Sequence, residues 1–459
     1  MLHGTSLPPF PAYFSGAPVI YPPLGALADS VGGLTGARIL SLIFMLGATV
    51  ALWSVTNRLH GRRAAFFACA LFAVLGPTLH LGAFATFDAM SLFLVTLAAW
   101  LVVRAGDRQD ATLWMLAAAV TLAVANATSY PSTLFDPVVI LLALVVALPK
   151  PGGKVAAGRA LTLLAVVALL ITLGLLVGGS RYMTGINATT LTRAAGNDSA
   201  ASIFTDSWTW TGVIVVAAIC GAIISWVSRP LHPQTWLLTL AAVAALLAPA
   251  EQAGLHTAAS LNKHVALGAW FAAIAAGYAV DKFAAGAPVG NMRTVTVGAC
   301  VIALSFPVTL GVGQSWVFST DWANSSDFTT ILRPFAVTGR LLVEDPTIAE
   351  YYLPSGTQWT RWSSTRNIIL PDEYFTGGPS VSAGVVGPGN ALTFAGYIAG
   401  NYFSLVALNF ADTTSLDHEI AADLRRNHNY KIVEIVPYGE GPAGPTQGTY
   451  VIWRYEPKS

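Results

Sequence analysis

Long apolar segments alternate with short polar loops over the first two thirds of this 459-residue chain. Ten such segments stand out, at about 37–56, 64–82, 85–103, 111–127, 134–148, 160–178, 210–227, 236–250, 264–280 and 294–312. A helix of about 20 apolar residues crosses a hydrocarbon layer of about 30 Å. The pattern therefore predicts a polytopic α-helical membrane protein with about ten transmembrane helices over residues 37–313.

The composition and the loop charges agree with a membrane protein. Charged residues make up 10% of the chain, whereas a soluble domain carries roughly 25%; the mean hydropathy is +0.60. One set of loops holds most of the Lys and Arg residues, namely Arg58, Arg62, Arg63, Arg104, Arg108, Lys150, Lys154, Arg159, Arg229, Lys282 and Arg293. The opposite ends hold Arg38, Arg181, Arg193 and Lys263. The positive-inside rule places the first set in the cytoplasm, and both ends of the chain outside it.

Residues 314–459 have a different character and are expected to form an external soluble α/β domain. Short β-rich runs at 340–344, 404–409, 430–436 and 449–455 alternate with helical segments at 346–352 and 415–426. In the second helix Leu416, Ile420 and Leu424 share one face, and Ser415 is the expected N-cap. The Gly- and Pro-rich stretch 377–389 is expected to be a loop.

Residues 1–36 are expected to be an external juxtamembrane segment, rich in Pro and Gly. An external N-terminus without a preceding span favours a gene model that lacks a first transmembrane segment. The alternative is that the first helix inserts as a reverse anchor.

Few ionisable residues lie at the external ends of the spans, and such residues are candidates for function. Asp88, in the sequence GAFATFDAM, can bind a cation, orient a sugar hydroxyl or act as a base, or can simply cap a helix. Lys263 and His264 open the ninth span, and Arg38 opens the first. These cations can bind a lipid phosphate, or can be interfacial side chains that reach toward water.

Other chemistry is less evident. Trp359, Arg361 and Trp362 can contact a glycan or peptide acceptor, or form a domain core with a cation–π pair. Cys69, Cys220 and Cys300 all lie in apolar spans and are expected to be packing residues. No metal-ligand cluster, P-loop or dinucleotide fingerprint is evident, and the net charge of +1 does not imply nucleic acid.

Four short sequence motifs in the first part of the chain, in their order, are similar to those of a known family. They are YPPL at 21–24, AR at 37–38, NRLHGRRAA at 57–65 and ATFDAM at 85–90. In this order and sidedness, the chain resembles the GT-C glycosyltransferases. The nearest likeness is to the dolichyl-phosphate-mannose protein mannosyltransferases of family 39 and their bacterial aminoarabinose-transferase relatives.

The resemblance implies sugar transfer from a polyprenyl-phosphate carrier to a lipid, glycan or protein acceptor outside the cytoplasm, in the plasma membrane. Arg38, Lys263, His264 and Tyr21 would lie near the lipid phosphate, and Asp88 would line the active site. A divalent cation is possible, because family members differ in this requirement. The family's acidic base, which follows its first transmembrane helix, has no counterpart before Tyr21, so the chain as written is expected to be weak or inactive.

Two other classes of function compete with a transferase. A lipid or solute transporter would usually show internal repeats and polar residues in the middle of several spans. A non-catalytic binding or assembly protein would use its external domain. Asp88, Arg38 and Lys263 gathered at one place would favour the transferase.

Overall fold

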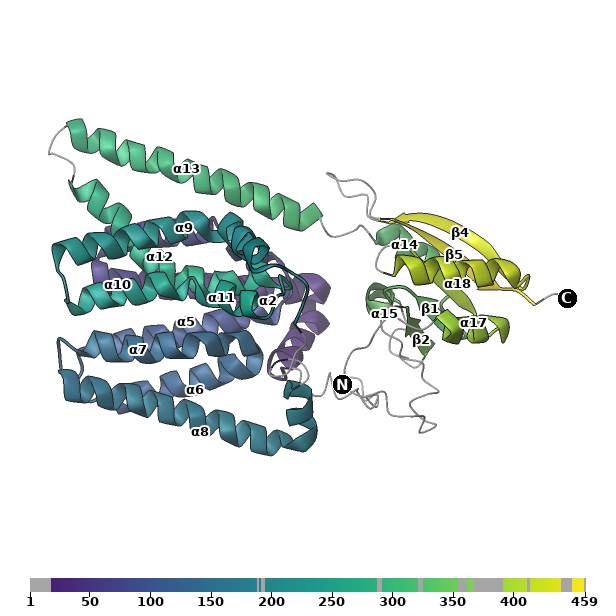
Figure 1. Cartoon of the computed structure of the whole chain (residues 1–459), viewed down its shortest axis with the longest axis horizontal. Helices are drawn as coiled ribbons and strands as arrows, with labels where there is room; N and C mark the ends of the chain where they lie inside the picture. Colours follow the sequence, from purple (N-terminus) through teal and green to yellow (C-terminus); the bar gives the residue numbers. More distant parts are fainter. Residues whose placement is uncertain are drawn as a thin grey trace. The chain divides into compact units, whose positions relative to one another are not determined.

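The computed structural model describes residues 18–187, 190, 195–286, 291–320, 325–353, 361–365, 391–410, 413–438 and 448–457. Two compact units meet between Trp316 and Val317, three residues beyond the boundary predicted from composition. The first unit is helical and the second contains a β-sheet (Figure 1).

All ten predicted spans coincide with helices of the first unit. These are α2 (Tyr21–His60), α3 (Arg62–Ala73) with α4 (Gly76–Ala83), α5 (Phe87–Ala105), α6 (Thr112–Thr128), η1 (Tyr130–Phe135) with α7 (Asp136–Ala147), α8 (Gly153–Ile186), α9 (Ala200–Ser228), α10 (Pro233–Ala244) with α11 (Leu247–Gly254), α12 (Leu261–Gly286) and α13 (Asn291–Thr320). Within the described residues, seven helices are long and apolar enough to cross a membrane, or eight if the bent pair α3–α4 counts as one span. The 17 residues of α6 fall below that length.

Helix α2 begins at Tyr21, earlier than the first predicted span at about residue 37. Residues 21–36, expected to be a juxtamembrane segment, are therefore helical. Pro22 and Pro23 occupy its first turn, where a backbone N–H has no partner within the helix in any case. A kink at Gly32 and Gly33 separates this segment from the first predicted span, and Gly33 takes a positive φ of 59°. The two prolines therefore start a helix and do not prevent one.

Helix α12 forms the centre of the bundle and packs against α3, α9 and α10. Its residues from Val265 to Ala279 are all buried, and most are Ala or Gly, which lets neighbouring helices approach closely. The indole of Trp270 is fully buried and donates from Nε1 to the carbonyl oxygen of Ala48 on α2, at 2.9 Å. Since α12 is buried on all sides, it ties the first helix to the later ones.

The second predicted span is broken. Helices α3 and α4 meet at an angle of 69°. The backbone N–H of Gly76, at the start of α4, donates to Oε1 of Gln314 on α13 at 3.1 Å. Gln314 in turn donates from Nε2 to the carbonyl oxygen of Thr209 on α9, at 2.7 Å. Close packing supports this contact, since a Cβ placed on Gly311 of α13 would collide with the carbonyl oxygen of Val74.

The C-terminal unit contains a five-stranded sheet with the order β2-β1-β3-β5-β4. The strands are β1 (Leu341–Val343), β2 (Trp362–Ser364), β3 (Leu405–Leu408), β4 (Tyr430–Tyr438) and β5 (Gly448–Tyr455). Strands β1, β2 and β3 are parallel, and β5 pairs antiparallel with both β3 and β4. Four of these strands were predicted, and β2 was not.

Helices cover both faces of this sheet, as its alternating side chains require. Leu341 and Val343 pack with α14 (Ser326–Leu332) and α15 (Thr347–Tyr352). Leu342 packs on the other face with α17 (Ala391–Ala399) and α18 (Thr414–Arg426). The predicted α/β layer fold is therefore confirmed. The N-cap of α18 is Thr413 rather than the predicted Ser415, and the predicted loop 377–389 lies outside the described residues.

A buried acidic pair lies at the carboxyl ends of the parallel strands. Glu344 follows β1, and its two carboxylate oxygens accept the backbone N–H groups of Asn409 (2.7 Å) and Thr413 (3.2 Å). Asp417 of α18 is fully buried beside it and accepts a hydrogen bond from the Thr413 hydroxyl at 2.9 Å. Burial and the charge of Glu344 raise the pKa of Asp417 well above its usual range, so the buried pair favours the protonated form of Asp417.

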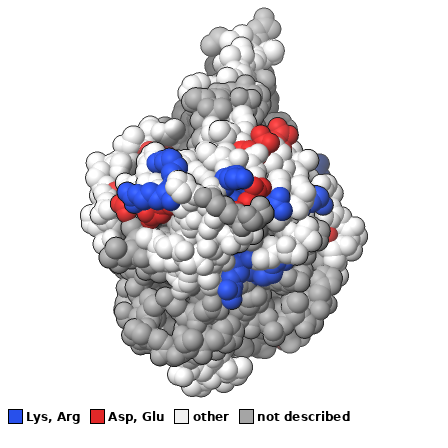
Figure 2. Space-filling view, turned by 90° about the vertical axis from the view of Figure 1, so that its right-hand side faces the viewer, with Lys and Arg blue, Asp and Glu red and all other residues white. Residues whose placement is uncertain are grey.

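Exposed charges of opposite sign pair in the C-terminal unit, as in Arg426–Asp423 (2.9 Å) and Lys431–Glu456 (3.1 Å). On the face in Figure 2, several described Lys and Arg residues lie beside Asp and Glu residues.

Candidate functional site

The sharp turn before α5 places Asp88 at the beginning of that helix. The N-cap is Thr86, whose Oγ1 accepts the backbone N–H of Asp88 at 3.2 Å, so Asp88 is not itself the cap. The same hydroxyl donates to Oδ2 of Asp88 at 2.9 Å. Asp88 is 5% exposed, and so its carboxylate depends on protein groups rather than on water.

Lys263 provides the opposite charge. Its Nζ lies 3.3 Å from Oδ2 of Asp88, and its side chain is 26% exposed. Ser129, which follows α6, donates to Oδ1 of Asp88 at 3.1 Å. Side chains from the beginnings of α5 and α12 and the end of α6 thus converge on one carboxylate, so residues far apart in sequence form one polar site.

Arg38 lies beside the same turn. Its guanidinium is 6.0 Å from the centre of the Phe84 ring, and the ammonium of Lys263 is 6.0 Å from the centre of the Phe87 ring. Ser41, one helical turn after Arg38, accepts the backbone N–H of Thr86 at 3.2 Å and so fixes α2 to the turn. Arg38 is exposed, whereas Lys263 is partly buried against Asp88. Two cations therefore flank the turn that carries one buried carboxylate.

The other two predicted phosphate-binding residues have different surroundings. His264 is adjacent to Lys263, and its Nδ1 is hydrogen-bonded to Nε2 of Gln252 on α11 at 2.6 Å. Tyr21 is buried at the start of α2 and packs over Gly25. His264 thus supports the beginning of α12, while the Tyr21 hydroxyl is buried and has no hydrogen-bond partner among the described residues.

A second buried carboxylate, Asp136, was not anticipated. It lies in the first turn of α7, and its Oδ2 accepts a hydrogen bond from Nδ2 of Asn126 at 2.7 Å. Oδ1 of Asn126 accepts from the Ser132 hydroxyl at 2.6 Å, and Oδ1 of Asp136 has no partner among the described residues. This cluster lies at the same α6–α7 connection as Ser129. An acidic residue next to a proline at the head of an apolar run was the available signal.

Within the described residues, no three His, Cys, Asp or Glu side chains gather closely enough to hold a metal ion. The arrangement instead suits an anion. A lysine and an arginine next to aromatic rings at one end of a helical bundle can hold a phosphate, and the carboxylate can hold the lysine in place.

Comparisons with known proteins found a partial match in sequence and several similar structures. Residues 26–177 match the family model of dolichyl-phosphate-mannose-protein mannosyltransferases. The structure is similar to ArnT from Cupriavidus metallidurans bound to undecaprenyl phosphate, with a TM-score of 0.61 and 12% identity over 96% of this chain and 88% of that one. The chain has the GT-C glycosyltransferase fold.

Two further GT-C proteins resemble the structure. The arabinofuranosyltransferase AftD from Mycobacteria has a TM-score of 0.57 and 15% identity, over 97% of this chain and 36% of that one. The Archaeoglobus fulgidus oligosaccharyltransferase AglB, solved with an inhibitory peptide and a dolichol-phosphate, has a TM-score of 0.50 and 14% identity over 91% and 64%. No curated protein matches the sequence significantly. The apolar segments predicted a polytopic fold with a C-terminal domain, and the short motifs predicted its likeness to GT-C proteins. Both predictions of the fold are confirmed.

The predicted acceptor-binding residues lie in the C-terminal unit. Arg361 donates to the carbonyl oxygens of Gly339 (2.7 Å), Val337 (3.2 Å) and Ala336 (3.3 Å). Trp362 belongs to β2 and is 3% exposed, whereas Trp359 lies outside the described residues. These contacts give Arg361 and Trp362 a structural role in the sheet and its neighbouring loop.

Proposed function

We propose that this chain is a membrane glycosyltransferase that transfers a sugar from a polyprenyl-phosphate carrier to an acceptor on the outer side of the membrane. The observation that carries the proposal is the Asp88–Lys263 ion pair, flanked by Arg38 at one end of a bundle with the GT-C fold. The match to a mannosyltransferase family model over residues 26–177 supports it.

Lys263 and Arg38 are proposed to bind the phosphate of the carrier. The phosphate is the leaving group of the transfer, so cations beside it stabilise the charge that develops as the bond to the sugar breaks. Lys263 is partly exposed and can turn toward a ligand, and Arg38 is already exposed. His264 would hold the beginning of α12, and the Tyr21 hydroxyl could donate to a phosphate oxygen.

Asp88 is proposed to respond to the arrival of that phosphate. Its Oδ1 accepts from Ser129, and its Oδ2 accepts from Thr86 and contacts Lys263. To accept a proton from a hydroxyl of the acceptor, Asp88 must exchange one of these partners for that hydroxyl. Lys263 is the partner for which a lipid phosphate competes. Binding of the carrier would then free the carboxylate oxygen that the transfer requires.

The loop charges favour an external location for this site, for the C-terminal unit and for the acceptor. Arg58 lies in the last turn of α2, well after Arg38, and Arg62 and Arg63 begin α3. The proposal therefore places donor and acceptor on the side of the membrane that carries few basic loops.

The test separates donor binding from turnover. Purified protein in lipid nanodiscs is titrated with undecaprenyl phosphate and assayed for sugar transfer from a panel of polyprenyl-phosphate sugars. Lys263→Met should weaken undecaprenyl-phosphate binding at least tenfold, and Asp88→Asn should reduce turnover by two orders of magnitude or more while leaving that binding within threefold. Lys282→Met, at the other end of α12, is the matched control. Unchanged undecaprenyl-phosphate binding by Lys263→Met would refute the proposed phosphate site.

A further inference from the structure

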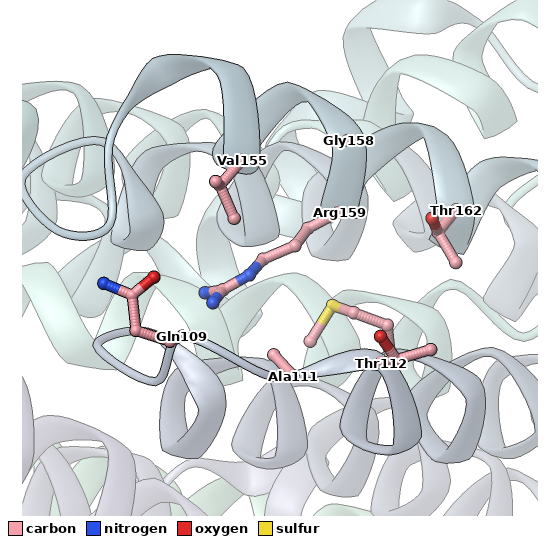
Figure 3. Close-up of a pocket in the computed structure, with 8 residues that line it drawn as sticks. Gln109, Ala111, Thr112, Val155, Gly158, Arg159 and Thr162 are labelled. Carbon is pink, nitrogen blue, oxygen red and sulfur yellow. The ribbon is translucent and has the colours of Figure 1, made fainter.

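A pocket of about 230 Å³ lies at the opposite end of the helical unit from Asp88. It is lined by Gln109, Ala111, Thr112, Met115, Val155, Gly158, Arg159 and Thr162 (Figure 3). Asp88 begins α5 and Arg159 contacts its last residue, so the two places are about 25 Å apart along a helix that rises 1.5 Å per residue. The pocket is therefore separate from the proposed active site.

Arg159 is the charged group of this pocket, and it is 5% exposed. Its Nη1 donates to the carbonyl oxygens of Ala105 (3.0 Å) and Gly106 (2.9 Å), and its Nη2 donates to that of Arg108. These acceptors are neutral, and within the described residues no carboxylate forms an ion pair with Arg159. The positive charge is thus buried without a carboxylate in direct contact among those residues, which is costly and would be relieved by a bound anion.

The guanidinium also has unused donor capacity. Its Nε is buried and has no hydrogen-bond partner among the residues that the structure describes. Figure 3 shows the side chain extending from α8 across the pocket toward the segment with Gln109 and Ala111, with the hydroxyl-bearing Thr112 and Thr162 beside the space. Polar side chains at the rim can complete the coordination of a small oxyanion.

The charge of Asp107 acts on Arg159 without a direct ion pair, and this carboxylate is engaged with another cation. Oδ1 of Asp107 lies 2.6 Å from Nη2 of Arg58. Oδ1 of Asp110 accepts the backbone N–H of Thr112 at 3.2 Å. Exposed Arg108 and Lys154 carry further positive charge near the pocket. The local balance of charge favours an anion.

The flanking surfaces are apolar and exposed. Leu113 of α6 is 79% exposed, and Leu161 of α8 is 64% exposed. In a membrane protein such surfaces face lipid chains. The pocket therefore offers a charged group to an amphipathic ligand whose apolar chain lies against α6 and α8. Its volume is below the roughly 300–1,000 Å³ of common small-molecule sites, which suits a headgroup better than a nucleotide.

We propose that this pocket binds the phosphate of an anionic phospholipid, with Arg159 as the main contact and the acyl chains lying along α6 and α8. Basic pockets between transmembrane helices at the cytoplasmic side are known to hold anionic headgroups. The inference is independent of the proposed sugar transfer, because it concerns the opposite end of the bundle.

Gly158 allows a test that leaves Arg159 in place. Gly158 lines the pocket, and a Cβ placed on it would meet nothing within 4 Å, so a larger side chain can begin there without a clash and is expected to occupy the pocket. Gly174 on the same helix is equally open and does not line the pocket, so Gly174→Phe is the matched control. Both variants remove one helical glycine and should unfold at temperatures similar to each other.

The full chain, purified in detergent and stripped of lipid, is titrated with phosphatidylglycerol and with phosphatidylcholine and analysed by native mass spectrometry. Gly158→Phe should weaken phosphatidylglycerol binding at least tenfold, and Gly174→Phe by less than twofold. Gly158→Asp should also weaken phosphatidylglycerol binding much more than Gly158→Asn does, because the added carboxylate repels the phosphate.

Three results would overturn the proposal. One is phosphatidylglycerol binding that Gly158→Phe leaves intact, which would mean that Arg159 only caps the end of α5. Another is equal affinity for phosphatidylcholine in the wild-type chain. The third is stabilisation by millimolar inorganic phosphate that Gly158→Phe abolishes, without a preference for the lipid, since the source of the phosphate would then be free in solution.

Discussion

The ion pair between Lys263 and Asp88 should be worth a measurable part of the stability of the helical unit. Lys263→Met leaves a carboxylate that is 5% exposed without its cation. Breaking a fully buried pair costs about 3–5 kcal/mol, whereas exposed pairs contribute about 0–1 kcal/mol. The Lys263 side chain is 26% exposed, and Asp88 keeps its bonds from Ser129 and Thr86. We therefore expect a loss of about 1–3 kcal/mol.

A double-mutant cycle isolates the pair. Unfolding of the purified chain is titrated with SDS in mixed micelles for the wild type, Lys263→Met, Asp88→Asn and the double variant. Asp88→Asn removes the charge while keeping the shape, so the double variant should recover part of the loss, with a coupling of about 1–3 kcal/mol. The exposed pair Lys431–Glu456 is the control and should couple by no more than about 1 kcal/mol. Additivity of the Lys263 and Asp88 substitutions within about 0.5 kcal/mol would refute the reasoning.

Three further predictions concern other parts of the chain. Thr86→Ala removes the N-cap of α5 and should lower the free energy of unfolding by about 1 kcal/mol; an unchanged SDS titration would contradict this. Gly311→Ala places a methyl group against the carbonyl of Val74 and should cost about 1–3 kcal/mol or more, whereas Gly313→Ala, which meets nothing, should be neutral or stabilising in the same assay. The pKa of Asp417, raised well above its value of about 3.9 in the unfolded chain, predicts that its contribution to stability is full below about pH 4, decreases as the pH rises, and is lost once the pH exceeds the raised pKa. Asp417→Asn should remove that pH dependence from hydrogen exchange of α18, and identical pH profiles for the two proteins would count against it.

The long apolar segments were sufficient to place the helices. A helix buried in lipid or protein needs such a segment, whatever its detailed packing. The same pattern could not show that α2 extends back to Tyr21, since Pro22 and Pro23 suggest a loop unless they fall in a first helical turn. The angle between α3 and α4 was also hidden, because the break depends on a partner more than 200 residues later.

The candidate site was only partly accessible from the sequence. Asp88, Lys263 and Arg38 could be selected as the rare ionisable residues at one end of the spans, and the structure joins the first two. Ser129 could not be selected, because hydroxyl residues are frequent and its contact with Asp88 depends on how α5 and α6 pack. Asp136 was overlooked within a predicted span, although its charge marks it in the same way as that of Asp88.

In the C-terminal unit, alternation and helix periodicity predicted four strands and the helices α15 and α18. Strand β2 contains only Trp362–Ser364, and three residues are too few for alternation to be recognised. The pairing of Glu344 with Asp417 was equally hidden, because nothing local to either acidic residue shows that the end of β1 adjoins the beginning of α18.

The contact of Gln314 with the break between α3 and α4 has a consequence for biogenesis. Helices are inserted in the order of their synthesis, so the N–H of Gly76 enters the membrane long before the amide that will accept its hydrogen bond. An unsatisfied backbone group is costly in lipid, and water or a transient protein partner would have to serve until α13 arrives. The broken helix would then acquire its final geometry only when α13 has been made. A ribosome-bound chain that ends before α13 should consequently hold the region around Gly76 in an immature, protease-accessible state.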